Sequence, residues 1–218
     1  AIQGLPVVMC LDRGGLVGED GVTHHGVFDM AAFGAVPGLT VAAPMNEPEL
    51  RNMMWTGLQA GAPFMIRYPR GLGEGLPWRG LPFETLPVGR GRRLREGRDV
   101  ALVTVGTVGN AAARAAERAA AQGVEAAHYD LRWVKPLDTE LLDEVGRTFR
   151  RVITVEDGCL RGGVGEAVAA YFNARGYDAH VTCLGIGDAW VEHGTPEQLH
   201  ALCGYDEESI LRALTQSA

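Results

Sequence analysis

The first third of the chain alternates short apolar runs with one clearly amphipathic segment. The apolar runs are continuous and bounded by breakers, which is typical of strands buried in a parallel sheet. Leu50, Met54 and Leu58 recur at helical spacing ahead of Gly61, a residue that favours a helix end. The pattern predicts strands at Leu5–Asp12, Leu39–Ala43 and Phe64–Tyr68, and helices at Val27–Ala35 and Glu47–Ala60.

The rest of the chain, from residue 99 onward, repeats this alternation of buried strands and helices. Its predicted strands are Val100–Val105, Glu125–Leu131, Val152–Glu156 and His180–Leu184. Its predicted helices are Asn110–Gln122, Asp138–Val145, Gly165–Arg175, Pro196–Leu202 and Glu207–Leu214. Strands that alternate with helices of this length imply parallel sheets with right-handed crossovers. We therefore expect an α/β protein with two parallel-sheet domains, the first of them incomplete.

Residues 71–98 differ in character from the blocks on either side. They contain seven Gly, three Pro and six Arg with little periodicity. Breakers at that density are typical of an interdomain connection, and the stretch 88–97 could form a hairpin within it. The sequence thus divides into residues 1–70, a linker at 71–98, and residues 99–218.

Composition narrows the possible partners. The 218 residues carry 20 basic and 27 acidic side chains, a net charge of −7. This balance argues against general affinity for nucleic acid or an anionic membrane, and no apolar run is long enough to span a bilayer. The four cysteines are Cys10, Cys159, Cys183 and Cys203. They are scattered and form no C-x-x-C pair, which indicates a cytoplasmic protein with free thiols and no zinc site.

Two arginines follow predicted strands of the first block. Arg13 comes after the first strand and Arg70 just after Phe64–Tyr68. Ligands of open parallel sheets bind at the carboxyl ends of the strands, and a guanidinium suits phosphate or carboxylate. If the two strands are neighbours, both side chains reach one mouth and form a small anion site. The alternative is that they are surface arginines paired with acidic neighbours such as Asp12 or Glu74.

The glycine-rich stretch 14–26 carries a second candidate site. Its five glycines allow left-handed turns and close approach to a ligand. Asp20 and His24 lie four residues apart, and a carboxylate beside an imidazole can take part in proton transfer. Equally, Asp20-Gly21 could form a simple turn and His24 could cap the following helix. The adjacent His24 and His25 point in different directions in extended chain, which makes a shared metal improbable.

Two further glycine clusters each follow a strand and open a helix, at 106–109 and 162–165. A helix start of this kind can seat a phosphate. Neither cluster completes the dinucleotide pattern G-x-G-x-x-G with its acidic partner. Close packing of helix against strand is the interpretation we favour for both.

The segment 11–26 (LDRGGLVGEDGVTHHG) resembles the pyrimidine-binding middle domain of transketolase-like thiamine-diphosphate enzymes. Ordinary transketolases share its core, G-E-D-G-x-T-H. The Asp12-Arg13 pair, the continuation HHGVFD at 24–29 and RYPRG at 67–71 resemble, more narrowly, the 1-deoxy-D-xylulose-5-phosphate synthase family. Similar stretches elsewhere extend the resemblance over essentially the whole chain: 37–46, 131–138, 162–165 and 192–196.

The resemblance implies a thiamine-diphosphate-dependent transferase. This family joins pyruvate to D-glyceraldehyde 3-phosphate, releases CO₂ and forms 1-deoxy-D-xylulose 5-phosphate, a precursor of isoprenoids, thiamine and pyridoxal. By motif, Arg13 and Arg70 would hold the acceptor phosphate or the donor carboxylate. His24 would transfer a proton at the developing alkoxide, and Asp20 would orient that site. His25 falls at a variable position and receives no role.

The resemblance also implies a missing part. In this family an N-terminal domain binds thiamine diphosphate and Mg²⁺, and the glutamate that activates the cofactor lies upstream of the first strand. We therefore expect no cofactor or metal ligands in this chain, and no activity without the N-terminal part of the same enzyme. Residues 1–70 would be the end of the pyrimidine-binding domain and residues 99–218 the transketolase C-terminal domain of a homodimer.

Other functions fit part of the sequence. One is a transketolase, and another is a 2-oxo-acid dehydrogenase β-type subunit, although such a subunit should contain its own activating glutamate. A third is a non-catalytic, transketolase-like assembly module. A scaffold of that kind has little need for Arg13, Asp20, His24 and Arg70 together.

Overall fold

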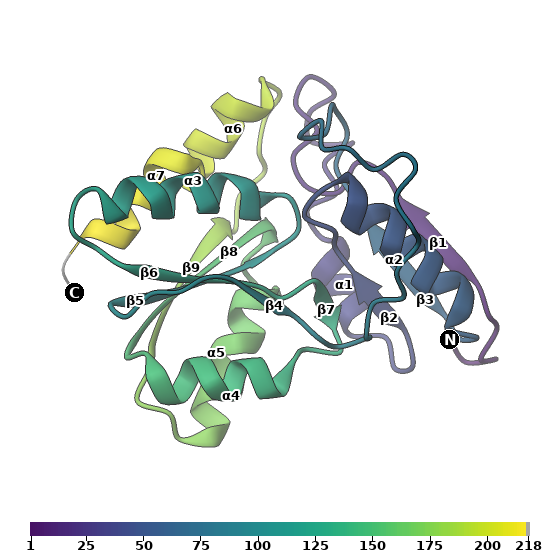
Figure 1. Ribbon diagram of the computed structural model, residues 1–218. Coiled ribbons are helices and arrows are strands. Elements are labelled where there is room, and N and C mark those ends of the chain that lie inside the picture. The colour runs from purple at the N-terminus through teal and green to yellow at the C-terminus, as the bar shows by residue number, and fades with distance from the viewer. Residues whose placement is uncertain (217–218) are drawn as a thin grey trace.

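The computed structural model describes residues 1–216, which form two α/β units lying side by side (Figure 1). The last two residues of the expected C-terminal domain, 217 and 218, lie outside the described residues. The smaller unit contains a sheet of four strands in the order β1-β3-β2-β7, and the larger a sheet of five in the order β4-β6-β5-β8-β9.

The small sheet is built mainly from the first block of the sequence. Its strands are β1 (Val8–Leu11), β2 (Thr40–Ala42), β3 (Phe64–Arg67) and β7 (Trp133–Lys135), and its helices are α1 (Asp29–Gly34) and α2 (Glu47–Gln59). β3 pairs in parallel with both β1 and β2. All four residues of β3 are buried, which agrees with the continuous apolar run expected of a central parallel strand.

The large sheet has helices on both faces (Figure 1). Its strands are β4 (Arg92–Arg95), β5 (Val100–Val105), β6 (Ala126–Asp130), β8 (Arg151–Cys159) and β9 (His180–Ile186). One face is covered by α3 (Val108–Ala120) and α7 (Glu207–Thr215), and the other by α4 (Thr139–Thr148) and α5 (Val164–Arg175). The remaining helix, α6 (Pro196–Cys203), reaches toward the small unit.

Small residues explain why α3 packs so closely on the large sheet. Ala112, Ala115, Ala116 and Ala119 form its buried face and are wholly buried. Alanine has the highest helix propensity and leaves little volume between helix and strand, so the same residues favour the helix and its packing.

The predicted alternation of strands and helices is confirmed, with two differences. The stretch 88–97 does not form a local hairpin; its strand β4 instead pairs antiparallel with β6, 38 residues away at the Arg92–Asp130 pair. The second difference is β7, a strand that the sequence pattern did not predict. It leaves the second block and pairs antiparallel with β2, so both sheets are mixed, with parallel centres.

A buried charge network joins the two units. The Glu49 carboxylate on α2 accepts hydrogen bonds from Arg132 at 2.8 and 2.9 Å and from Arg92 at 3.0 Å. Arg92 also bonds Asp130, which is fully buried. Burial raises the pKa of Asp130 to about 6 although Arg92 opposes the shift. Because an unpaired charge in this position would be costly, the network fixes how α2 sits against the larger unit.

Candidate functional site

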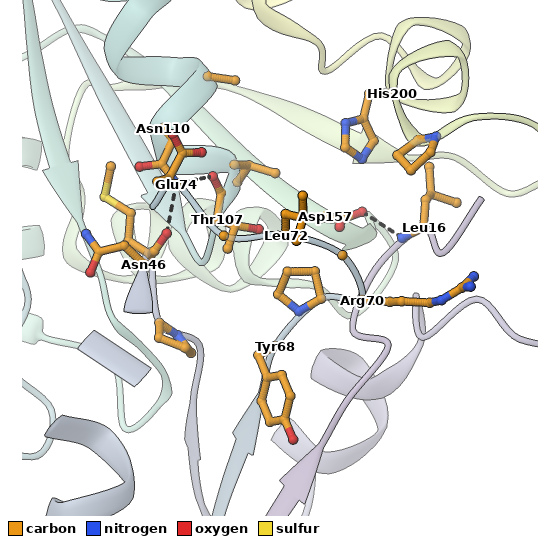
Figure 2. Close-up of a pocket in the computed structure, with 18 of the residues that line it drawn as sticks. Leu16, Asn46, Tyr68, Arg70, Leu72, Glu74, Thr107, Asn110, Asp157 and His200 are labelled. Carbon is orange, nitrogen blue, oxygen red and sulfur yellow. Dashed lines mark hydrogen bonds between the residues drawn. The ribbon is translucent and has the colours of Figure 1, made fainter. Parts of the chain in front are cut away.

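The carboxyl ends of the parallel strands in both sheets border one cavity between the two units. Its volume is about 560 Å³, and its walls come from the segments after β2, β3 and β5, from Asp157 near the end of β8 and from α6 (Figure 2). Arg70 extends on the side of Leu16 and Asp157, away from Asn46 and Asn110 (Figure 2). This is the position where open α/β sheets bind ligands.

Arg13 and Arg70 meet at a single carboxylate on the Leu16 side of this cavity. Arg13 Nη1 lies 2.7 Å from Asp20 Oδ2, and Arg70 Nη1 lies 3.1 Å from the same oxygen. The two arginine side chains remain 40% and 46% exposed, so a ligand can reach both. Two guanidiniums against one carboxylate leave a net positive charge, which suits a small anion. Neither arginine pairs with Asp12 or Glu74 among the described residues.

Strand pairing explains why these two arginines converge. β1 and β3 are neighbours in parallel, with Leu11 opposite Arg67. The pairing continues past the strands, since Tyr68 N donates to Leu11 O at 3.0 Å and Gly14 N to Tyr68 O at 2.9 Å. Arg13, between these bonds, has a φ of +62°, a left-handed conformation that is unfavourable for a residue with a side chain. Such strain is concentrated at functional sites, where the surrounding structure holds it in place.

Asp20 and His24 lie on the same stretch, which we call the glycine-rich loop (residues 13–26), but they do not contact each other. His24 is exposed and its Nδ1 lies 2.9 Å from Thr23 Oγ1. In the part of the chain that the structure describes, no hydrogen bond joins His24 to the Asp20 carboxylate. His24 does not cap the next helix, because the N-cap of α1 is Phe28. The loop therefore presents His24 to solvent.

Asp157 at the end of β8 anchors the glycine-rich loop from the larger unit. Its Oδ1 accepts hydrogen bonds from Leu16 N at 3.2 Å and from the Tyr205 hydroxyl at 2.6 Å. Burial raises the pKa of Tyr205 well above its ordinary value, and the neighbouring Asp157 carboxylate adds to the shift. Tyr205 thus stays a neutral donor. Sequence reasoning missed Asp157, although an acidic residue near the carboxyl end of a buried strand is a usable signal.

Arg67 is a second residue without a predicted role. It is 5% exposed and pairs with Asp29 at 2.8 Å. Its guanidinium also donates to the carbonyls of Gly26 at 3.2 Å and Asp157 at 2.9 Å. Arg67 therefore ties the end of the glycine-rich loop to both units.

The two other glycine clusters are packing sites, as expected. A Cβ at Gly109 would lie 3.1 Å from Met45 Sδ, and one at Gly165 would lie 2.6 Å from Thr154 Oγ1. The start of α5 is occupied by Glu156, whose carboxylate accepts from Val164 N at 2.9 Å and Gly165 N at 2.8 Å. The start of α5 is therefore filled by the protein's own side chain, whereas the start of α3 borders the cavity.

Comparisons with known proteins identify the domains that this chain contains. The family described as the transketolase pyrimidine-binding domain matches residues 1–74, and the transketolase C-terminal domain matches residues 89–210. A protein named 1-deoxy-D-xylulose-5-phosphate synthase from Bacteroides fragilis is 52% identical over 100% of this chain and 34% of its own length. A protein of the same name from Carboxydothermus hydrogenoformans is 44% identical over 96% of this chain and 33% of its own length.

Solved structures give the same fold. One titled "Split gene transketolase, inactive beta4 tetramer" superposes with a TM-score of 0.83 at 28% identity, covering 98% of this chain and 67% of that one. The chain spans about a third of the length of the curated relatives it matches. The pyrimidine-binding domain matches residues 1–74, and the C-terminal domain matches residues 89–210, more than half of this chain. The chain therefore belongs to the transketolase family.

Proposed function

We propose that this chain is the substrate-side portion of a thiamine-diphosphate-dependent transferase. The reaction would join pyruvate to D-glyceraldehyde 3-phosphate with loss of CO₂, giving 1-deoxy-D-xylulose 5-phosphate. The observation that carries the proposal is the convergence of Arg13 and Arg70 on Asp20 at 2.7 and 3.1 Å. Relatives named 1-deoxy-D-xylulose-5-phosphate synthase, 44–53% identical, favour this reaction over the transketolase reaction.

The two arginines would hold an anionic group of a substrate, either the acceptor phosphate or the donor carboxylate. Guanidinium groups form paired, charge-assisted hydrogen bonds to both anions. Asp20 keeps Arg13 and Arg70 aimed at one point in the free protein and would orient them around the anion. His24, exposed on the same loop as Asp20, would take or give the proton at the alkoxide oxygen that forms during carbon–carbon bond formation.

Thiamine diphosphate and Mg²⁺ would be held mainly by another part of the enzyme. Within residues 1–216, no group of three or more His, Cys, Asp or Glu side chains could hold a metal ion. The start of α5 is occupied by the Glu156 carboxylate, whereas the start of α3 borders the cavity. In the family that the sequence resembles, the N-terminal domain binds the cofactor and its metal, and we propose the same arrangement for the full-length enzyme.

The oligomeric state and the activity of the isolated chain are part of the same proposal. We propose that the full enzyme is a homodimer and that this chain by itself does not turn over pyruvate. The similar split transketolase chain carries the description "inactive beta4 tetramer", which supports both the tendency to associate and the lack of activity. The four cysteines are free thiols, which fits a reducing compartment such as the cytoplasm. Within the described residues, no helix is both long enough and apolar enough to cross a bilayer.

The test is a product assay on the full-length protein. With thiamine diphosphate, Mg²⁺, pyruvate and D-glyceraldehyde 3-phosphate, we expect 1-deoxy-D-xylulose 5-phosphate and CO₂ in equal amounts. Unphosphorylated glyceraldehyde is the matched control, and it should be used with a much higher KM because the arginines have no phosphate to hold. The 218-residue chain alone should form no product. Lack of product from the full-length protein, or cofactor-dependent turnover by the short chain, would contradict the proposal.

A further inference from the structure

His25 bridges the glycine-rich loop and the larger unit. Its Nδ1 accepts a hydrogen bond from Val17 N at 3.1 Å, and its Nε2 lies 3.1 Å from the carbonyl oxygen of Val191. Because Val17 N can only donate, the ring is neutral there, with its proton on Nε2 donated to Val191 O. One side chain thus closes the loop on itself and fastens it to the segment 187–195, which precedes α6.

The residues that the bridge encloses are the ones that matter for the proposed site. Asp20 and His24 lie between Val17 and His25 in sequence. The same stretch packs against the larger unit without spare room: a Cβ at Gly18 would lie 3.0 Å from Gly194 O, and one at Gly21 would lie 3.3 Å from His193 Cβ. Any loosening at His25 would therefore move Asp20 and His24 relative to the larger unit.

We propose that His25 is a positioning residue for the substrate site, an inference that rests on the proposed function. Through it, segment 187–195 of the larger unit sets the conformation of the loop that carries Asp20 and His24. Asp20 in turn aligns Arg13 and Arg70. The larger unit therefore contributes to substrate binding through its contact with this loop.

The bridge has a defined chemical requirement. The side chain at residue 25 must accept a hydrogen bond at one end and donate one at the other. Glutamine meets this requirement with its carbonyl oxygen and its amide NH₂, and alanine cannot meet it at all. His25→Gln should therefore restore the function that His25→Ala removes, although it replaces the aromatic ring with an open-chain amide.

The experiment compares His25→Ala and His25→Gln in the full-length enzyme, with the exposed His180 changed to Ala as the control. Losing two hydrogen bonds that hold the loop should lower kcat/KM about 5- to 30-fold. The KM for D-glyceraldehyde 3-phosphate should rise, because the arginine pair loses its alignment. His25→Gln should recover most of the loss, and His180→Ala should match the wild type. Hydrogen exchange should speed up in peptides from 13–26 in His25→Ala only.

Three results would overturn the inference. The first is an unchanged kcat/KM in His25→Ala, and the second is a His25→Gln variant as impaired as His25→Ala. The third is a lower kcat with an unchanged KM, which indicates fewer folded molecules and not a misplaced loop. If the wild-type enzyme makes no product, the proposed function fails, but the exchange of the 13–26 amides still tests whether His25 holds the loop.

Discussion

Gly15 and Asp157 approach so closely that only a hydrogen fits between the main chain of one and the carboxylate of the other. A Cβ at Gly15 would lie 1.6 Å from Asp157 Oδ2, and Gly15 also has a φ of +79°. The two residues are 142 positions apart in sequence and come from different units of the fold. The absence of a side chain at residue 15 is therefore what lets the larger unit hold the glycine-rich loop.

Replacing Gly15 by alanine should separate this steric contact from the backbone strain. Gly15→Ala should lower the free energy of unfolding by about 2–5 kcal/mol, the sum of a left-handed alanine and an overpacked site. Gly38→Ala is the matched control, because Gly38 has a φ of +73° but no neighbouring atom within 4 Å. Gly38→Ala should lower the free energy of unfolding by only about 1–2 kcal/mol. Urea denaturation of both variants measures the difference, and equal losses would show that Asp157 does not press on residue 15.

The strained backbone at Arg13 gives a second prediction. Because Arg13 has a φ of +62°, the Arg13→Gly variant should be more stable than Arg13→Ala, with a free energy of unfolding about 1 kcal/mol higher. Both variants lose the same ion pair to Asp20, so their difference reports the backbone alone. Arg70 is not among the residues with positive φ, and there the order should reverse, with Arg70→Ala more stable than Arg70→Gly. An Arg13→Ala variant at least as stable as Arg13→Gly would contradict the observed conformation.

Two groups on β6 make stability depend on pH in opposite directions. Burial lowers the pKa of His128 from 6.5 to about 4, and burial raises the pKa of Asp130 from 3.8 to about 6. Between pH 4 and 6.5 the folded state binds fewer protons at His128 than the unfolded chain does. The contribution of His128 to the free energy of unfolding therefore increases as pH rises. Between pH 3.8 and 6 the folded state binds more protons at Asp130 than the unfolded chain does. The contribution of Asp130 to the free energy of unfolding therefore decreases as pH rises.

Replacing one of the two groups should reveal the pH dependence that the other gives to the free energy of unfolding. Asp130→Asn should make the free energy of unfolding rise more steeply from pH 4.5 to 6 than in the wild type. His128→Gln should make it rise less or fall over the same interval, while keeping a polar partner for Thr104, 2.9 Å from His128 Nε2. Urea denaturation at several pH values gives both slopes. Slopes that match the wild type in both variants would show that neither group titrates in this interval.

Much of this fold could be predicted from periodicity, because each central strand is a continuous apolar run and each helix carries its own apolar face. β5 begins and ends at Val100 and Val105 as expected, since all six of its residues are buried. β7 could not be predicted, because three residues carry no period and its partner β2 lies more than 90 positions upstream. β4 was misjudged for the same reason: its partner is not the next strand along the chain.

The site divides in a similar way. Arg13 and Arg70 could be selected from sequence, since each follows a strand and the strands proved to be neighbours. Their common partner, Asp20, was singled out for a different contact, with His24, which the structure does not show. Asp157 and Tyr205 act on the loop across more than 140 residues. Long-range contacts of this kind leave no local pattern, so only the folded chain reveals them.

The most direct test of the account is the KM for D-glyceraldehyde 3-phosphate of the full-length enzyme carrying Arg70→Ala. Losing a charge-assisted hydrogen bond to the phosphate should raise this KM about 10- to 100-fold. Arg79→Ala is the matched control, because Arg79 is an exposed arginine whose guanidinium lies over the ring of Trp78. We expect a large rise for Arg70→Ala and none for Arg79→Ala. The proposed role of Arg70 is contradicted if Arg70→Ala leaves the KM values for both D-glyceraldehyde 3-phosphate and pyruvate equal to those of the Arg79→Ala control.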